Sequence, residues 1–352
     1  MGNRPRAILR QWSFALLLIL CAPALPSAAQ EPPPPQHSLA GFTHIYQQWN
    51  NCGPAALAMA LTHFGYPADQ RPAAQWLKPN PEDLNVSPWQ MEAYVAERVP
   101  GINVITRIGG DIPRLKSLIA AGFPVLIEAG YDPEPETLGW MGHYLLVYGY
   151  DDASANFYTH DSYSGPSLPY SYAYIDRFWS HFNRTYLVLY EAGREAELMA
   201  LLGDDADPFQ NAINAYLSEL NRAQRDENDP FLWHNLGSSL TTLGEYEQAA
   251  IAFDEARRRG DGLPWRMTWY QFGIYEAYLQ TGRFSDLLTL IDTSIRNGSQ
   301  PDRLFKVEET YYYLGRAREA QGDPIAAARH YRTALELNAN FRPAQDALAA
   351  LG

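Results

Sequence analysis

The sequence changes character near residue 208, and this change most constrains what the chain can fold into. Before it, runs rich in β-branched and aromatic residues alternate with amphipathic stretches, whereas after it strand patterns disappear and only helical patterns remain. Glycines at positions 244, 282 and 322 divide the second half at intervals of 38 and 40 residues. At roughly 100–200 residues per domain, 352 residues accommodate two domains. We therefore expect an α+β domain followed by an all-α repeat.

The second half, residues 208–352, has the spacing of tetratricopeptide repeats. One copy consists of Trp233, Leu236, Gly237, Gly244, Tyr246, Ala249, Phe253 and Ala256. Another begins 78 residues later at Tyr311, and a degraded copy around Tyr278 lies between them. About three repeats are needed for a stable stack, so we expect capping helices near 208–221 and 343–351. Such a solenoid offers a concave surface to a protein partner.

The N-terminal segment, residues 1–29, has the order of a secretory signal. Arginines precede an apolar stretch, and small residues then allow cleavage after position 29. An uncleaved anchor is the alternative, although a membrane span needs about 20 apolar residues. A lipid anchor on Cys21 is disfavoured by the bulky Leu20 before it. Each interpretation places the remaining chain outside the cytoplasm, and the prolines of residues 30–37 predict an extended linker.

The charge balance excludes several classes of partner. The chain has 40 Asp and Glu residues against 27 Lys and Arg, so a nucleic-acid partner, which needs clustered basic residues, is not expected. Membrane contact is expected only if the N-terminal segment stays uncleaved. The sequence has no HExxH or CxxC motif and predicts neither a metal nor another cofactor.

Removal of the leader leaves a single cysteine, Cys52. Pro54 fits a first helical turn, apolar residues recur at helical spacing between positions 57 and 64, and Gly65 is a suitable helix stop. Cys52 is therefore placed at a helix N-terminus, where the helix dipole and free N–H groups lower the pKa of a thiol. On this pattern alone, a structural cysteine and a nucleophile are equally good interpretations.

A histidine and an aspartate follow at the ends of two expected strands. His143 begins the strand that runs to residue 151, and Asp161 ends the next one, where an ordinary turn aspartate is the alternative. Adjacent strand residues point to opposite faces, so only one of His160 and Asp161 reaches His143. We choose Asp161, because a carboxylate fixes the tautomer of an imidazole and stabilises its protonated form.

The order of these residues along the chain is that of papain-like cysteine peptidases: a glutamine, a cysteine at a helix start, a histidine on a strand and an aspartate on the next strand. Segments 46–57, 142–151 and 161–165 resemble the bacteriocin-processing, double-glycine-type cysteine peptidases and their exported relatives. The resemblance covers residues 38–192 and implies a papain-like α+β fold. It also implies that Cys52 is the nucleophile, that His143 is the general base and that Asp161 orients His143.

The resemblance further implies an upstream glutamine that serves the oxyanion hole. Transporter-linked members commonly place it six residues before the cysteine, which here is Tyr46. We therefore assign this role to Gln47, with Gln48 as the alternative. A side-chain amide at either position can donate a hydrogen bond to an oxyanion, alongside the backbone N–H of Cys52.

The sequence thus predicts an exported cysteine peptidase that hydrolyses peptide bonds of a peptide or protein substrate, with a repeat domain that docks the substrate or a partner. A catalytically silent peptide-binding adaptor is one alternative. An acyl or peptidyl transferase with the same thioester chemistry is another. All predicted catalytic residues precede position 192, so we expect residues 30–192 alone to act on short peptides.

Overall fold

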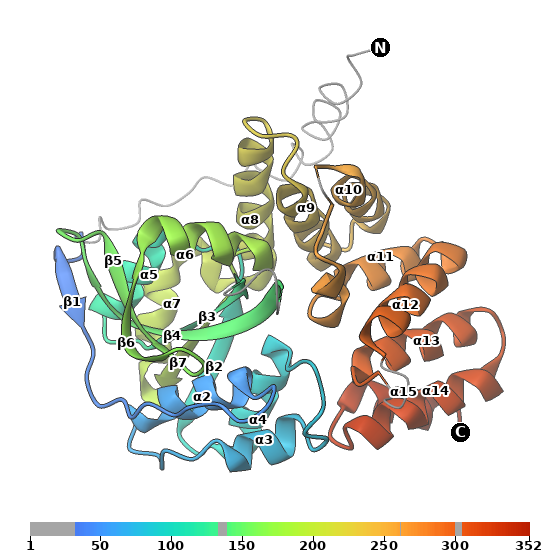
Figure 1. Ribbon diagram of the computed structural model, residues 1–352, viewed down its shortest axis with the longest axis horizontal. Coiled ribbons are helices and arrows are strands. Elements are labelled where there is room, and N and C mark those ends of the chain that lie inside the picture. Colours follow the sequence, from blue (N-terminus) through green and yellow to red (C-terminus); the bar gives the residue numbers. More distant parts are fainter. Residues whose placement is uncertain (1–31, 133–138, 261, 300–304) are drawn as a thin grey trace.

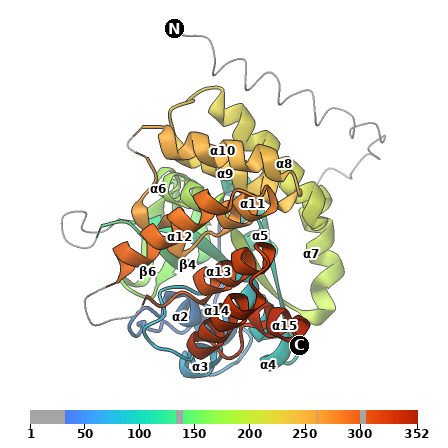
Figure 2. The ribbon, with the colours of Figure 1, turned by 90° about the vertical axis from the view of Figure 1, so that its right-hand side faces the viewer.

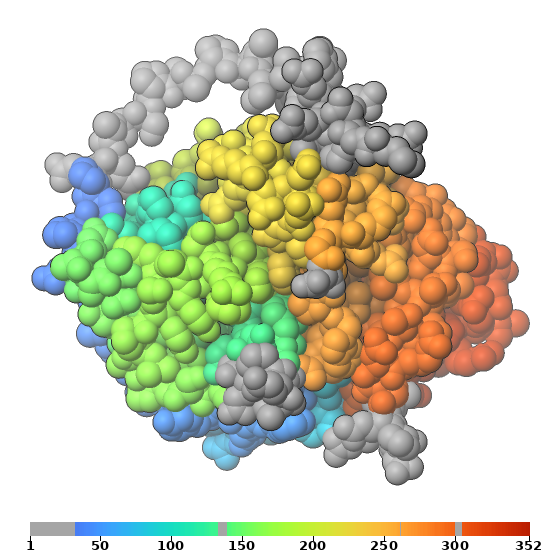
Figure 3. Space-filling model, turned by 45° about the horizontal axis from the view of Figure 1, so that its top comes forward, coloured from blue at the N-terminus to red at the C-terminus, as the bar shows by residue number. Residues whose placement is uncertain are grey.

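The computed structural model describes residues 32–132, 139–260, 262–299 and 305–352, which form two units packed against each other (Figure 1). The first unit is an antiparallel sheet with helices on both faces. The second unit consists of helices α8 to α15, and the two units meet along a continuous boundary in the space-filling view (Figure 3).

Within the described residues, seven strands form one sheet in the order β2-β7-β3-β4-β5-β6, and β1 also pairs with β4. The strands are β1 (Gln36–Ser38), β2 (Ile102–Arg107), β3 (Val125–Tyr131), β4 (Met141–Asp151), β5 (Asn156–Asp161), β6 (Gly165–Ser171) and β7 (Tyr186–Glu191). Every pairing is antiparallel. Strand β4 is the longest, and it carries His143 near its start.

Successive residues of the central strands belong to two different cores, because side chains of a strand alternate between faces. Leu126 and Leu187 pack with one set of helices, whereas Val125 and Val188 pack with the other. The first set is α2 (Cys52–Thr62), α3 (Arg71–Leu77) and α4 (Pro88–Arg98). The second set is α5 (Ile112–Ala120), α6 (Tyr172–Trp179) and α7 (Glu195–Leu202). Short 3-10 turns are η1 (Ser180–Phe182), η2 (Ala192–Arg194) and η3 (Gly203–Ala206).

The repeat unit stacks antiparallel helices, as the glycine and aromatic spacing predicts. Its elements are α8 (Pro208–Ala223), α9 (Pro230–Thr242), α10 (Tyr246–Arg258), η4 (Trp265–Trp269), α11 (Gly273–Gln280), α12 (Phe284–Gly298), α13 (Glu308–Ala320), α14 (Pro324–Leu337) and α15 (Arg342–Ala350). A Cβ atom on Gly237 would lie 2.8 Å from the Phe253 ring, and one on Gly315 would lie 2.3 Å from the Tyr331 ring. These glycines therefore let an aromatic ring of the next helix fit against the backbone.

Buried polar contacts join the two units at both ends of their boundary. At one end, Arg184 forms an ion pair with Glu219 at 2.5 Å, and the Asn183 amide donates to Ser239 at 3.0 Å. At the other end, Glu308 and Glu309 of α13 accept hydrogen bonds from the segment that starts α4. Figure 2 shows α14 beside α3, where the Asn338 side chain at the end of α14 donates to the Leu77 carbonyl at 2.9 Å. The units are therefore held together by specific contacts.

The end of the expected linker at residues 30–37 forms part of a strand. Gln36 and His37 pair with Asp151 and Tyr150 of β4, so the end of that segment belongs to the sheet. The expected signal at residues 1–29 lies outside the described residues. In the part of the chain that the structure describes, no helix combines the length and the apolar character needed to cross a bilayer.

Candidate active site

Cys52 is the first residue of α2, and a buried glutamine shapes the turn that leads into this helix. The Gln70 carbonyl oxygen accepts from the Asn51 side chain at 2.6 Å and from the Gln48 backbone at 3.0 Å, while the Gln70 amide donates to the Tyr46 carbonyl at 2.8 Å. Three bonds from one buried side chain thus fix the backbone before Cys52. Pattern analysis missed Gln70, because it lies 18 residues from the cysteine in no recognisable motif.

His143 and Asp161 meet across the β4–β5 pair. Asp161 of β5 lies opposite Leu145 of β4, and His143 is two residues before Leu145. Asp161 and His143 are therefore diagonal neighbours, whose side chains can reach each other. The His143 Nε2 atom and the Asp161 Oδ1 atom are 2.8 Å apart, and both side chains are buried. His160 instead stacks on Tyr148, with ring centroids 4.6 Å apart. The structure therefore brings Asp161 to His143 and leaves His160 on another surface of the strand.

Three further donors surround the Asp161 carboxylate. The backbone N–H groups of Tyr163 and Ser164 donate at 2.8 and 3.1 Å, and the Tyr170 hydroxyl donates at 2.9 Å. Burial alone would raise the pKa of Asp161, but the hydrogen bond and charge of His143, together with the two backbone donors, hold it well below its usual range. Asp161 is therefore a permanent anion under physiological conditions.

The Cys52 thiol and the His143 ring are directly hydrogen-bonded, and each shifts the other's titration. Burial would lower the pKa of His143, but its bonds to Asp161 and Cys52 raise it to about 10. Burial would raise the pKa of Cys52, yet the bond to His143, the charge of His143, the Tyr144 backbone N–H and the charge of Lys78 leave it lowered. Each group therefore stabilises the charged form of the other, a thiolate beside an imidazolium.

Gln47 is tied to the residue that follows Asp161. Its backbone N–H donates to the Ser162 carbonyl at 2.8 Å, and the Ser162 hydroxyl donates to the Gln47 side-chain oxygen at 2.8 Å. Because the oxygen of the amide is engaged, its nitrogen is left to donate elsewhere, and within the described residues it makes no hydrogen bond. Gln48 is exposed, and both glutamines line the same cleft.

A cleft of about 340 Å³ lies over Cys52 and His143. It is lined by Gln47, Gln48, Trp49, Asn50, Cys52, Leu84, Tyr131, Met141, Gly142, His143, Tyr163 and Tyr270. Tyr270 follows η4, so the repeat unit supplies part of the cleft wall, although all the predicted catalytic residues precede position 192. A Cβ atom on Gly142 would lie 3.0 Å from the Tyr270 ring, so this glycine admits the tyrosine beside His143.

Lys78 is a second residue that pattern analysis missed. It is buried, and its ammonium group donates to the Asn50 carbonyl at 2.7 Å and to the Asp83 carbonyl at 2.9 Å. Asn50 has a positive φ of 53°, so this donor stabilises a turn that disfavours most side chains. Among the described residues, no group of three His, Cys, Asp or Glu side chains is arranged to hold a metal ion.

Comparison with known proteins agrees with this architecture. Residues 39–193 match the Peptidase_C39 like family, and residues 232–256 match a tetratricopeptide repeat. The chain thus joins a domain that matches the C39-like family to a helical repeat. The expected fold, a papain-like α+β domain followed by an all-α tetratricopeptide repeat region, is thereby confirmed.

The matched family is broad, so the bacteriocin-processing type stays a prediction. Among solved structures, a C39-like peptidase from Bacillus anthracis is similar at 17% sequence identity, with a TM-score of 0.37, over 44% of this chain and 98% of that one. No curated protein was found to match the sequence.

Proposed function

We propose that the protein is an exported cysteine peptidase that uses Cys52 as nucleophile, His143 as general acid and base, and Asp161 to orient His143. The observation that carries the proposal is the continuous chain of hydrogen bonds from the thiol to the imidazole and on to a carboxylate that has three further donors. Such a chain both activates a thiol and fixes the imidazole that must move the proton.

In the proposed reaction, the Cys52 thiolate attacks the carbonyl carbon of the scissile peptide bond. The Gln47 amide nitrogen and the Cys52 backbone N–H donate to the oxyanion that forms. The C–N bond then breaks as the His143 imidazolium transfers its proton to the leaving amine. Water adds to the resulting thioester while His143 accepts its proton, and loss of the thiolate releases the acid.

We propose that the repeat unit takes part in binding the peptide substrate as well as a protein partner. Tyr270 lines the cleft next to Gly142, and the Arg266 guanidinium donates to the Trp140 carbonyl at 3.1 Å. The Gln271 amide donates to the His181 carbonyl at 2.9 Å. These two bonds hold the segment around Tyr270 against the first unit, so the tyrosine forms part of the cleft wall.

The test uses a chain without residues 1–29, which contains Cys52 as its single cysteine. Alkylation by iodoacetamide at pH 6 should be rapid, because the thiol is ionised there, and His143→Ala should slow it by about tenfold or more. Cys52→Ala should abolish both labelling and the cleavage of a peptide library followed by mass spectrometry. A folded wild-type chain that labels no faster than free cysteine would contradict the proposal.

Export has a separate test. The chain expressed in full in a bacterial host should be recovered outside the cytoplasm, and its N-terminal sequence should begin at residue 30. Recovery of the intact leader in the membrane fraction would instead support the anchor alternative.

A further inference from the structure

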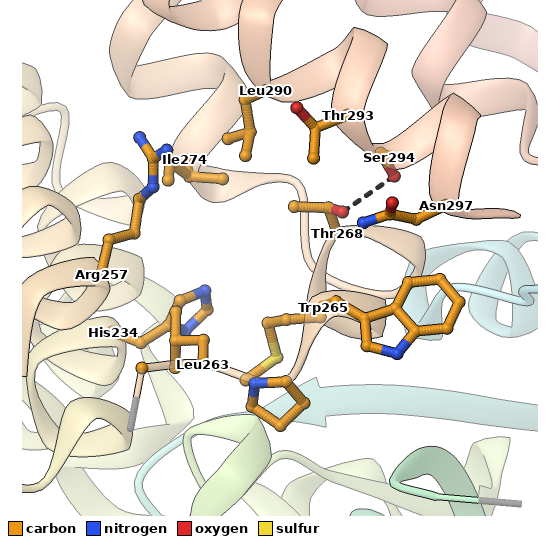
Figure 4. Close-up of a pocket in the computed structure, with 13 residues that line it drawn as sticks. His234, Arg257, Leu263, Trp265, Thr268, Ile274, Leu290, Thr293, Ser294 and Asn297 are labelled. Carbon is orange, nitrogen blue, oxygen red and sulfur yellow. Dashed lines mark hydrogen bonds between the residues drawn. The ribbon is translucent and has the colours of Figure 1, made fainter. Parts of the chain in front are cut away.

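The repeat unit contains a cavity of about 320 Å³ that has no residue in common with the catalytic cleft (Figure 4). Helices α9, α10, α11 and α12 and the segment around η4 surround it. None of the described residues that line it is acidic, although acidic residues outnumber basic ones 40 to 27 in the whole chain. The cavity is therefore an exception to the acidic character of the protein.

Three consecutive arginines lie at the C-terminal end of α10, and the first of them, Arg257, lines this cavity. Arg258 and Arg259 form ion pairs with Glu255, whereas Arg257 forms no ion pair within the described residues. Its guanidinium donates to the Tyr278 hydroxyl at 3.3 Å and lies at one end of the cavity (Figure 4). A guanidinium without an ion pair among the described residues, on a cavity whose described lining has no carboxylate, favours an anionic group.

A buried imidazole lies beside it. His234 is 2% exposed, its ring lines the cavity, and its Nδ1 atom is buried without a hydrogen-bond partner within the described residues (Figure 4). Burial lowers the pKa of His234 to about 4, so the ring is neutral near pH 7 and can both donate and accept a hydrogen bond. Buried polar groups in native proteins usually have partners, so His234 is a candidate hydrogen-bonding group in the cavity wall.

The remaining walls divide into an apolar and a polar side. Leu263, Met267 and Leu290 supply aliphatic surface, whereas Thr293 and Asn297 place polar groups along α12. We propose that the cavity binds an aliphatic carboxylate, with the anionic group on Arg257 and the hydrocarbon part against the aliphatic wall. The C-terminal residue of a peptide and a short fatty acid both have this chemistry.

The segment that lines the cavity, η4, leads directly into the residue that lines the cleft, Tyr270. Met267 and Thr268 line the cavity, and Tyr270, two residues further on, lines the cleft that contains Cys52. The Thr268 hydroxyl donates to Ser294 of α12 at 2.8 Å, which ties η4 to the cavity wall (Figure 4). A ligand that packs on Met267 therefore restrains Tyr270, and this part of the inference rests on the proposed peptidase function.

Binding is tested by calorimetry on the chain of residues 30–352 with N-acetyl-leucine, N-acetyl-leucine amide and octanoate. The two carboxylates, or one of them, should bind, and the amide should bind at least about tenfold more weakly. A response to N-acetyl-leucine alone indicates a peptide end, and a response to octanoate alone indicates a fatty acid. Equal binding of the acid and its amide, or no binding of any probe, would overturn the proposal.

Two arginine variants localise the site. Arg257→Gln should weaken binding of the carboxylate by about tenfold, whereas Arg258→Gln, whose partner Glu255 lies outside the cavity lining, should leave it unchanged. His234→Leu should also weaken binding, and its melting temperature separates loss of the site from loss of the fold. Equal effects of the two arginine variants would place the ligand elsewhere.

The link to the cleft is tested by kinetics with a short peptide. Saturating carboxylate should lower KM at least about twofold in the wild type and leave KM unchanged in Arg257→Gln. Binding without any change in KM would overturn the link through η4 while leaving the cavity as a ligand site. Calorimetry measures binding without turnover. Binding by a chain that cleaves no peptide would therefore contradict only the proposed peptidase function, whereas cleavage without binding would contradict only the cavity.

Discussion

Two clusters of buried ionisable side chains can be compared in this molecule. In the candidate active site, Cys52, His143 and Asp161 alternate in charge, and each stabilises the ion next to it. At the boundary between the units, three carboxyl groups lie close together, those of Asp83, Glu308 and Glu309, with Lys78 as the nearby cation. A neighbouring opposite charge favours the ionised form of a buried group. Burial beside a group of like charge favours the uncharged form, which for a carboxyl group is the protonated one.

The boundary cluster shows this clearly in its hydrogen bonds. Glu309 accepts from the Ser87 hydroxyl at 2.7 Å, and Glu308 accepts from the Gln90 amide at 2.8 Å. One oxygen of each of the three carboxyl groups has no hydrogen-bond partner within the described residues. Burial, followed by the charge of Glu308, raises the pKa of both Asp83 and Glu309 well above the usual range. Asp83 and Glu309 therefore keep their protons to a higher pH than ordinary carboxyl groups do.

The largest effect is expected from Asp161→Asn, which breaks the alternation in the active site. The imidazole loses its orienting anion, so turnover should fall by about 10²–10⁴. Because the bond to Asp161 raises the pKa of His143, the variant should lose its imidazolium at lower pH, and the alkaline limb of the activity profile should move toward neutrality. An unchanged alkaline limb, measured as kcat/KM from pH 5 to 10.5, would contradict the assigned pairing.

Gln47→Ala keeps the three charged groups and removes only a neutral donor. Turnover should fall by about 10²–10³, the usual size for loss of one oxyanion donor, while the rate of Cys52 alkylation should stay the same. Gln48→Ala is the matched control, because this side chain is exposed and neighbours Gln47 on the same cleft. If the control loses turnover and Gln47→Ala retains it, the oxyanion role belongs to Gln48.

Lys78→Met tests whether the two clusters are coupled. The ammonium group donates to Asn50 beside the active site and to Asp83 at the boundary, and its charge contributes to the lowered pKa of Cys52. Without it, the pH midpoint of Cys52 alkylation should rise, and kcat/KM near pH 6 should fall by roughly tenfold. Arg71→Met, an exposed change at the start of α3, the helix that ends just before Lys78, should alter neither quantity. An unmoved midpoint would show that the clusters act independently.

The contrast also explains what the sequence could predict. Cys52, His143 and Asp161 each lie in a short motif, and the latter two belong to neighbouring strands joined by a short turn, so local patterns were sufficient. Repeat helices were predicted in the same way, because Gly237 and Gly315 each face an aromatic ring of the next helix.

Residues brought in by long-range packing left no such pattern. Tyr270 reaches the cleft from the repeat unit, and Glu308 meets Gln90 across 218 residues. For the same reason, the expectation that residues 30–192 act alone needs revision. That fragment lacks Tyr270 and leaves Arg184 without its buried partner Glu219, so we now expect it to be less stable and less active on short peptides.

The smallest effect is expected from Glu309→Gln, which removes one titrating group from the boundary and keeps an oxygen for the Ser87 hydroxyl. The pKa of Glu309 is raised in the folded chain, so folding retains a proton that the unfolded chain releases near pH 4.5. The contribution of Glu309 to the stability of the wild type is therefore fully present below pH 4.5, and it is lost as the pH rises toward the pKa of Glu309 in the folded chain. The variant has no such proton, and its melting temperature should decline less between pH 5 and pH 8, with a gain of roughly 3 °C at pH 8.

Glu336→Gln, an exposed change on α14, should follow the wild type in calorimetry at both pH values. A wild type whose melting temperature declines no more than that of Glu309→Gln would show that Glu309 is ionised in the folded chain, and the boundary cluster would then resemble the active site in stabilising charge.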